Sequence, residues 1–349
     1  MKQQNNNLSR RNFLRNAAIT TGIAASGPLA AAASAPDPGN NRKKLPREVW
    51  ITSVSQEGLT ATSPEAMINQ LYKLLESKTI YQPDIVCLPE TFTTANISTT
   101  VTSEQKKQAS AYALEKFSQF AKQHGCYVIC PVITQENGKS YNSGVLFDRS
   151  GKQVGEYHKI HLTEGEISRG LTPGSLDPPV FKTDFGTIGI QICFDMVWDD
   201  GWAKLKEKGA EIVFWPSAYG GGNSINNKMW NHHYIVVSST RKGAAKICDI
   251  DGNEPAGTGF WDPNFLCGPV NLNKEFLHCW PYVRRFDEIK QKYGRDVRIT
   301  LFHDEEWSII ESLSPDIPIK QIMKEFQLKS YQEHKMSAEI AQIATRKNN

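Results

Sequence analysis

The sequence predicts a mixed α/β protein, because short apolar runs alternate with amphipathic segments along most of its 349 residues. Hydrophobic residues make up 39% of the chain and charged residues 22%, as is typical of a globular protein with a full core. No internal repeat is visible. Without its N-terminal segment, the chain has the length of one large domain or two small ones.

Local signals place the individual elements. Ser63, Pro64 and Glu65 have the form of a helix start, and Gly125 has the form of a helix end. A last, polar segment rich in Lys and Gln is expected to form a packing arm. We expect helices at residues 63–78, 104–124, 202–208 and 320–347, and strands at residues 49–55, 84–88, 126–134, 141–147, 187–192, 211–215, 234–239 and 246–250.

The N-terminus resembles a twin-arginine export signal. Arg10 and Arg11 precede Phe13-Leu14 and a mildly apolar, Ala-rich tract that ends near Ala35, with the expected cut after Ala33. Pro, Gly and Asn then dominate a short spacer. The sequence therefore predicts an exported, periplasmic or secreted protein with four parts: a signal peptide at residues 1–35, a linker at 36–46, a catalytic domain at 47–312 and a C-terminal helical extension at 313–349.

The formal net charge of +3 comes from the N-terminal segment. Its first 35 residues hold four basic residues and no acid, so the remainder is close to neutral. A neutral chain offers no general field for nucleic acid, and the Ala-rich tract is too weakly apolar for a lasting membrane anchor. We expect neither nucleic acid nor a membrane as a stable partner.

The cysteines predict neither a zinc site nor a disulfide framework. There are seven, an odd number, without a Cys-x-x-Cys pair. Cys126 and Cys130 share one predicted strand, where about 13 Å would separate them at roughly 3.3 Å per residue, too far for a bridge. We expect at least one free cysteine and no metal.

Three segments place reactive side chains directly after strand-like runs. They carry Glu90 in Leu-Pro-Glu, Lys159 in Tyr-His-Lys-Ile-His-Leu, and Cys193 in Gly-x-x-x-Cys-Phe-Asp. The thiol can serve as nucleophile and the glutamate as general base, while the lysine and the backbone N–H of Phe194 can stabilise an oxyanion. His158 and His161 flank the lysine and are expected to shape the strand end.

Together, and in this order, these segments resemble the nitrilase superfamily of carbon-nitrogen hydrolases. The resemblance spans roughly residues 47–312. It implies an α-β-β-α sandwich that pairs into a four-layer αββα-αββα homodimer, a catalytic triad of Glu90, Lys159 and Cys193, and no cofactor or metal. It also implies a supporting glutamate before Pro173-Gly174; Glu164 and Glu166 both fit, and the spacing favours Glu166.

The expected activity is hydrolysis of a non-peptide amide or carbamoyl bond through a cysteine thioester. Asp195 stands where true nitrilases tend to have Glu, which favours amides over nitriles. N-acyl transfer and a catalytically inactive binding protein are the remaining alternatives. The chain lacks the Gly-x-Ser-x-Gly, His-Glu-x-x-His and phosphate-loop motifs of other hydrolase classes.

The substrate pocket is expected to be apolar. Its predicted lining follows Cys193 and the next strand, namely Met196, Val197, Trp198, Ser217 and Tyr219. These residues contain no cation, so neutral amides are expected to react faster than anionic ones. One alternative stays open, because a loop can bring a cation over the cleft from a nearby position: Lys204, Lys206, Arg241 or Lys242.

Overall fold

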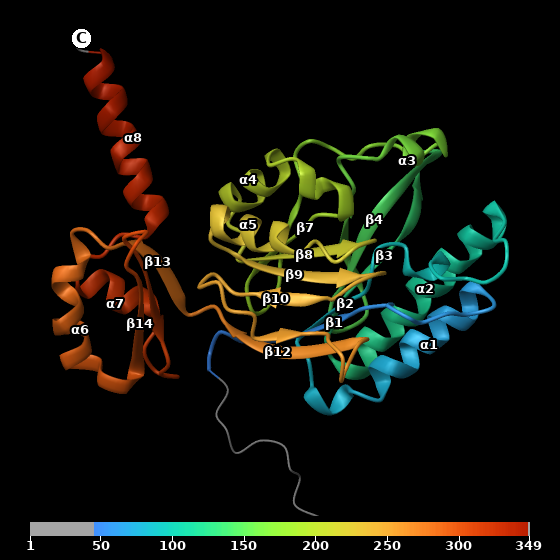
Figure 1. Ribbon diagram of the computed structural model, residues 1–349, viewed down its shortest axis with the longest axis horizontal. Helices are drawn as coiled ribbons and strands as arrows, with labels where there is room; N and C mark the ends of the chain where they lie inside the picture. Colours follow the sequence, from blue (N-terminus) through green and yellow to red (C-terminus); the bar gives the residue numbers. More distant parts are fainter. Residues whose placement is uncertain (1–44, 348–349) are drawn as a thin grey trace, which may run out of the picture. The chain divides into compact units, whose positions relative to one another are not determined.

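The structure, a computed structural model, describes residues 45–347. The expected export signal and most of the expected linker lie outside the described residues. Two six-stranded sheets form the centre of the fold (Figure 1). The first contains, in spatial order, β12 (Phe265–Asn271), β1 (Glu48–Val54), β2 (Ile85–Cys87), β3 (Tyr127–Glu136), β4 (Lys139–Phe147) and β5 (Gln153–His158). The second contains β11 (Ala256–Gly257), β10 (Lys246–Cys248), β9 (Ile235–Thr240), β8 (Ile212–Ser217), β7 (Thr187–Ile190) and β6 (Val180–Lys182).

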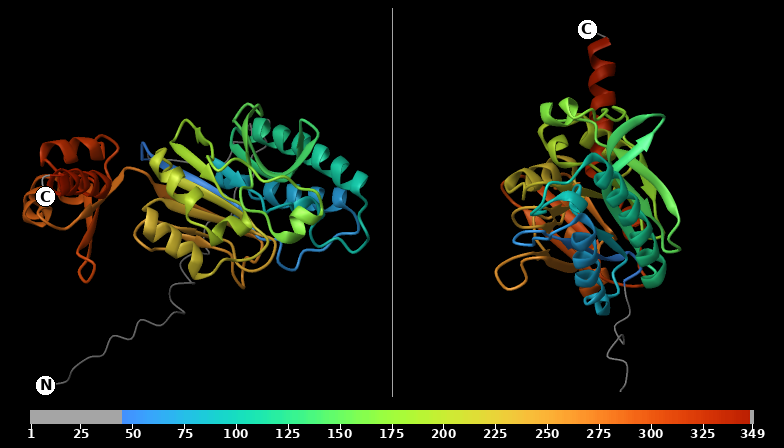
Figure 2. Two further views of the ribbon diagram at one scale, coloured as in Figure 1. Left: turned by 90° about the horizontal axis from the view of Figure 1, so that it is seen from above. Right: turned by 90° about the vertical axis from the view of Figure 1, so that its right-hand side faces the viewer.

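The sheets pack face to face, and helices cover their outer sides. In β2, Ile85 and Cys87 belong to the core between the sheets, whereas Val86 packs under the helices of the first sheet. Strands buried on both faces read as continuous apolar runs, as this one does. Helices lie on opposite outer sides of the paired sheets: α1 (Pro64–Glu76) and α2 (Ser103–His124) on the first, α4 (Asp200–Glu207) and α5 (Asn223–His232) on the second (Figure 1, and from two further directions in Figure 2). The predicted α-β-β-α sandwich is confirmed.

Capping explains where the two long helices of the first sheet begin. The Ser63 hydroxyl accepts a hydrogen bond from the Ala66 N–H at 3.2 Å, at the start of α1. Thr102 and Gln105 form a reciprocal capping box at the start of α2, which ends at Gly125 with φ +60°. These signals place both helices within two residues of their predicted ends.

The C-terminal part forms a smaller unit with its own core. Its antiparallel sheet has the order β13-β15-β14. The strands and helices are β13 (Lys274–His278), α6 (Phe286–Tyr293), β14 (Val297–Phe302), β15 (Trp307–Ser312), α7 (Ile319–Glu325) and α8 (Tyr331–Lys347). This unit starts well before residue 313, where the sequence interpretation placed the extension.

The prediction of a single helix at residues 320–347 is wrong. The segment forms two helices, α7 and α8, because Phe326 and Leu328 are drawn into the small core while Gln327 adopts φ +53°. Among residues 45–347, no helix combines the length and apolar character that crossing a membrane requires.

The topology gathers several strand ends at one place. Strands β1, β2 and β3 run parallel, as do β7, β8 and β9, so their carboxyl ends share an edge within each sheet. The Ser239 hydroxyl of β9 lies 2.9 Å from the Val54 carbonyl oxygen and 3.0 Å from the Cys87 carbonyl oxygen, which joins these edges. Ligands of α/β proteins bind at such carboxyl ends.

Candidate active site

A cavity of about 730 Å³ opens at these strand ends. Glu90 follows β2, Lys159 follows β5 and Cys193 follows β7, and all three side chains line the cavity. The structure thus brings together the three residues that the sequence selected for chemistry. Residues from α2, β3, β4, α3 (Glu164–Ser168) and the ends of β8 and β9 complete the lining.

Lys159 is held at the base of the cavity by two carboxylates. Its Nζ donates to Glu90 Oε1 at 3.0 Å and to both Glu166 oxygens, at 3.0 and 2.8 Å. The Asn142 side chain on β4 donates to the same pair, at 2.9 Å to Glu90 and 2.8 Å to Glu166. Burial alone would lower the pKa of Lys159, but the charges of Glu90 and then of Cys193 and Glu166 raise it above its usual value. The lysine is therefore a fixed cation with all three N–H donors engaged.

Of the two glutamates left open by the sequence, Glu166 is the one that contacts Lys159. It sits at the third position of α3, where its carboxylate also accepts from the Thr163 N–H at 2.9 Å, whereas Glu164 is exposed. Burial opposes ionisation of Glu166, but Lys159 outweighs it and lowers the pKa of Glu166.

Gly174 holds the backbone of Lys159 in place. Its N–H donates to the Lys159 carbonyl oxygen at 2.8 Å. A Cβ at Gly174 would lie only 2.2 Å from the His158 carbonyl oxygen, so glycine alone fits here.

Cys193 occupies a strained turn at the start of a short 3₁₀ helix, Cys193–Val197. Its φ of +45° lies in the left-handed region, which costs a non-glycine residue about 1–3 kcal/mol. Asp195 holds this turn. Its fully buried carboxylate accepts from the Tyr157 hydroxyl at 2.7 Å, the Ile192 N–H at 2.8 Å and the His161 N–H at 2.8 Å. The segment after β5 and the segment after β7 therefore share one buried anchor.

The environment keeps the resting Cys193 thiol protonated. Burial raises its pKa to about 11 and the charge of Glu90 adds to the rise, while Lys159 and hydrogen bonds from Ala218 and Ser217 lower it. A thiol of this pKa reacts at neutral pH only if a base removes its proton during attack.

The other cysteines lie elsewhere. All seven are within the described residues and none forms a disulfide. Cys193 is the only one of the seven in the cavity lining. Full burial raises the pKa of Cys87 and Cys130 far more than that of Cys193, in keeping with small residues of the core.

The predicted pocket residues after Cys193 do not line this cavity. Asp195 turns the chain away, so Met196 packs beneath α4 and α5, Val197 is 62% exposed, and Trp198 stacks on His161 with 4.2 Å between ring centroids. The Phe194 ring packs edge-on against Trp198. Residues 196–198 therefore form no part of the lining of this cavity.

The two predicted pocket residues at the end of β8, Ser217 on the strand and Tyr219 just after it, are also absent from the lining. Ser217 is buried and its side chain hydrogen-bonds to Cys193, so it acts on the sulfur rather than on a substrate. Tyr219 is 40% exposed, and burial together with the charge of Cys193 raises its pKa.

Sequence reasoning left Arg241 open as a possible cation of the site and missed Lys106, Lys107, Arg169 and Asn142. Arg241, one of the open alternatives, follows β9 and places Nη2 3.6 Å from Glu90 Oε2. Lys106 and Lys107 on α2 and Arg169 at the end of α3 also line the cavity. Asn142 lies in the polar half of β4, between Tyr141 and Ser143, so no sequence signal marked it, and nothing marked the helix lysines.

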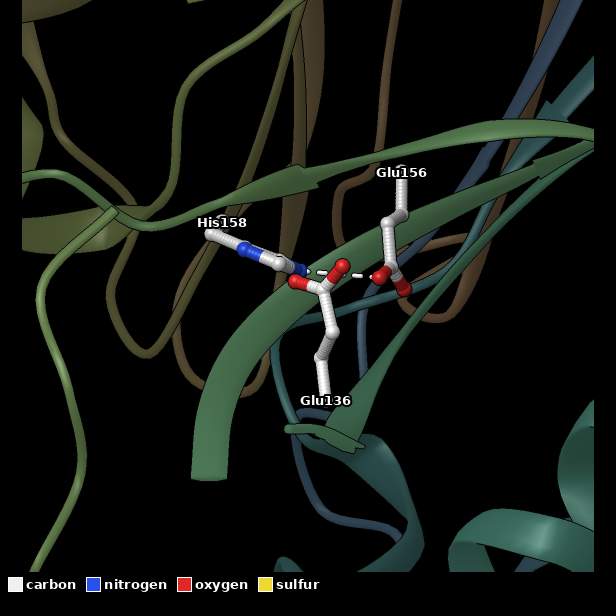
Figure 3. Close-up of side chains that lie close together, drawn as sticks. All are labelled: Glu136, Glu156 and His158. Atoms are coloured by element: carbon white, nitrogen blue, oxygen red, sulfur yellow. Dashed lines mark hydrogen bonds and ion pairs between the residues drawn. The ribbon is translucent and has the colours of Figure 1, made fainter. Parts of the chain in front are cut away.

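One group of potential metal ligands lies outside the cavity. Glu136 at the end of β3 and Glu156 and His158 on β5 place one ligand atom each within 4.8 Å of one another (Figure 3). His158 Nε2 and Glu156 Oε1 are already hydrogen-bonded at 2.9 Å, as the dashed line in Figure 3 indicates. None of these three residues lines the cavity.

Comparison with known proteins identifies the class. The profile of the carbon-nitrogen hydrolase family matches residues 51–241, more than half of the chain. The protein belongs to the carbon-nitrogen hydrolase family.

Individual relatives are more distant. The chain is 31% identical over 150 residues to the deaminated glutathione amidase of Synechocystis sp. (strain PCC 6803 / GT-S), covering 39% of this chain and 54% of that protein. It is 30% identical over 169 residues to the N-carbamoylputrescine amidase of Oryza sativa subsp. japonica, and this match covers 44% of this chain and 56% of that protein. The match thus spans only about half the length of these curated relatives.

Solved structures support the fold. A carbon-nitrogen hydrolase from Helicobacter pylori G27 superimposes with a TM-score of 0.57 at 18% identity, covering 71% of this chain and 93% of that one. The amidase of Nesterenkonia sp. AN1, solved with acrylamide added to its active-site cysteine, gives a TM-score of 0.56 at 14% identity, covering 70% and 99%. At such identities the likeness concerns the fold alone.

Proposed function

We propose that this protein is an amidase-like hydrolase that cleaves a non-peptide amide or carbamoyl C–N bond through a thioester on Cys193. One observation carries the proposal: the Cys193 thiol shares a cavity with Glu90 and with a lysine held between two buried carboxylates. The family and the amidase relatives point the same way.

In the acylation half-reaction, Sγ of Cys193 attacks the carbonyl carbon while the Glu90 carboxylate takes the thiol proton. Because the thiol pKa is about 11, attack and proton transfer belong to one step. The C–N bond of the tetrahedral intermediate then breaks, and Glu90 returns its proton to the leaving nitrogen. Ammonia or an amine departs, and the acyl group remains on Cys193.

The hydrogen bonds of Lys159 link proton transfer to oxyanion binding. In the resting site its three donors go to Glu90 and Glu166. Protonation of Glu90 removes the charge that holds one of them, which frees an N–H for the oxyanion as it forms. The backbone N–H of Phe194 is the second proposed donor.

Deacylation repeats the sequence with water. Glu90 takes a proton from water as its oxygen attacks the thioester carbon. The C–S bond then breaks, and Glu90 gives the proton to the departing sulfur. The products are a carboxylic acid, or a carbamic acid from a carbamoyl substrate, and the free Cys193 thiol.

The test is ammonia release by the purified full chain from amides, carbamoyl compounds and nitriles. We expect turnover of an amide or carbamoyl compound, none with Cys193→Ala or Cys193→Ser, and unchanged turnover with Cys267→Ala, a half-buried cysteine outside the cavity. Serine fails because Glu90 cannot activate a hydroxyl comparably. Faster turnover of nitriles, or acyl transfer to hydroxylamine without hydrolysis, would support one of the alternatives. A chain that binds these compounds without turnover would be a binding protein.

Export by the twin-arginine route to the periplasm or medium is part of the proposal. Residues 1–46 fused to a folded reporter should carry it out of the cytoplasm, and the combined Arg10→Lys and Arg11→Lys change should retain it. Unchanged export of the double-lysine fusion would contradict this route. Assembly into a homodimer or a higher homo-oligomer is also proposed, and a monomeric mass in light scattering would contradict it.

A further inference from the structure

We infer that the natural substrate is an amide that carries a carboxylate at the end remote from the scissile bond, and that Lys106, Lys107 and Arg169 form the site for this carboxylate. The inference rests on the proposed function. It reverses the preference for neutral amides that the sequence suggested.

The lining of the cavity is strongly unbalanced in charge. It contains five cationic side chains, Lys106, Lys107, Lys159, Arg169 and Arg241, against two carboxylates, Glu90 and Glu166. Both carboxylates are hydrogen-bonded to Lys159 at the base. The excess positive charge therefore belongs to the rest of the wall.

Of the four remaining cations, one is held by a carboxylate of the base and three form no ion pair with a described residue. Arg241 faces Glu90 at 3.6 Å and donates to the Thr91 hydroxyl at 3.3 Å, so it belongs to the base of the cavity. Within residues 45–347, no carboxylate forms an ion pair with Lys106, Lys107 or Arg169. These three exposed side chains are available to an anion in the cavity.

The position of the lysines disfavours a purely structural role. Lys106 and Lys107 lie near the N-terminus of α2, which begins at Ser103, where the helix dipole favours acidic rather than basic side chains. A carboxylate between them would offset this repulsion and interact with the dipole favourably. Arg169 adds a planar guanidinium that can bind a carboxylate through two parallel hydrogen bonds.

The size and polarity of the cavity fit an extended polar substrate. Its volume of about 730 Å³ lies in the usual range for pockets that enclose small organic ligands. Hydroxyl and amide side chains make up much of the remaining lining: Thr91, Thr94, Ser103, Gln135 and Ser140. The reacting amide can thus meet Cys193 while a carboxylate some bonds away meets the lysines.

The test compares matched anionic and neutral amides with the full chain. Glutaramic acid and glutaramide form one pair, and succinamic acid and succinamide the other; the diamides are corrected for their two reactive groups. We expect kcat/KM to favour the anion at least tenfold and the advantage to shrink with added salt.

The double variant Lys106→Gln, Lys107→Gln should reduce the ratio of kcat/KM for the anionic amide to that for the neutral amide at least fivefold, and Arg169→Gln should also reduce it. Lys122→Gln, an exposed lysine on the same helix outside the cavity, is the matched control and should leave the ratio unchanged.

The outcomes separate this inference from the proposed function. Turnover with no preference for the anion, or a preference that survives the double variant, would overturn the inference and leave the hydrolase intact. Absence of turnover with every amide would overturn the proposed function. In that event the amide substrate falls with the proposed function, and calorimetric titration with glutarate decides the carboxylate site alone: saturable binding that the double variant weakens supports the site, and binding that is absent or insensitive to the variant overturns it.

Discussion

Asp195→Asn tests whether the buried carboxylate holds the nucleophile turn. In the native site, one carboxylate oxygen accepts from Tyr157 and Ile192 and the other accepts from His161. An amide has one such oxygen, so its NH₂ group must face a buried backbone N–H on one side. An unsatisfied buried donor costs about 1–3 kcal/mol, and the lost charge-assisted bonds add to this. We expect the free energy of unfolding to fall by about 2–4 kcal/mol and kcat to fall at least tenfold, as the strained Cys193 backbone relaxes.

The assay is urea unfolding followed by tryptophan fluorescence, combined with steady-state kinetics on the best amide. Asp200→Asn is the matched control, because Asp200 also pairs with His161, at 3.4 Å, but its side chain is 43% exposed. Such an exposed pair contributes less than about 1 kcal/mol. If Asp195→Asn and Asp200→Asn behaved alike in both assays, the assignment of Asp195 as the anchor of the turn would be refuted.

Three further predictions concern the base of the cavity. Glu90→Gln removes the charge that helps to raise the Cys193 pKa, so the ultraviolet absorbance of the thiolate should titrate at lower pH while hydrolysis falls about 100-fold or more; an unchanged titration would contradict the coupling. Lys159→Met should lower kcat about 100-fold or more, in line with loss of an oxyanion donor, and near-native kcat would exclude that role. Folding lowers the pKa of Glu166, so the ionised carboxylate stabilises the folded protein. This contribution to the free energy of unfolding is fully present above the unfolded pKa of about 4.3 and is lost as the pH falls through the lower pKa of the folded state. Glu166→Gln should therefore flatten the loss of stability in acid unfolding, and an unchanged acid profile would argue against the ion pair with Lys159.

Local signals were sufficient for most of the sandwich core, but β5, β6, β11, β12 and α5 were not predicted. The boundaries of α1 and α2 follow from their caps, and β1, β2, β8 and β9 follow from continuous apolar runs. The strands of the small C-terminal unit were missed, although β14 alternates apolar and polar residues as a half-buried strand does. The break between α7 and α8 combines tertiary burial of Phe326 and Leu328 with a missed local signal, since Ser330 and Glu333 form a capping box at the start of α8.

The active site could likewise be predicted only in part from the sequence. Glu90, Lys159 and Cys193 were selected because each follows a strand within a motif, and the structure places all three in one cavity. The wall of that cavity was not predictable by nearness in sequence. Asp195 diverts the chain that follows Cys193, and the cations come from α2, α3 and the end of β9, which only the packed fold brings together.

The most direct test of the central claim is peptide mass spectrometry of the full chain, acid-quenched during turnover of its best amide. We expect an added mass equal to the acyl group on the peptide that contains Cys193, and no added mass on peptides that contain the other six cysteines. Acylation of a different residue, or continued turnover with Cys193 unmodified at every quench time, would contradict it.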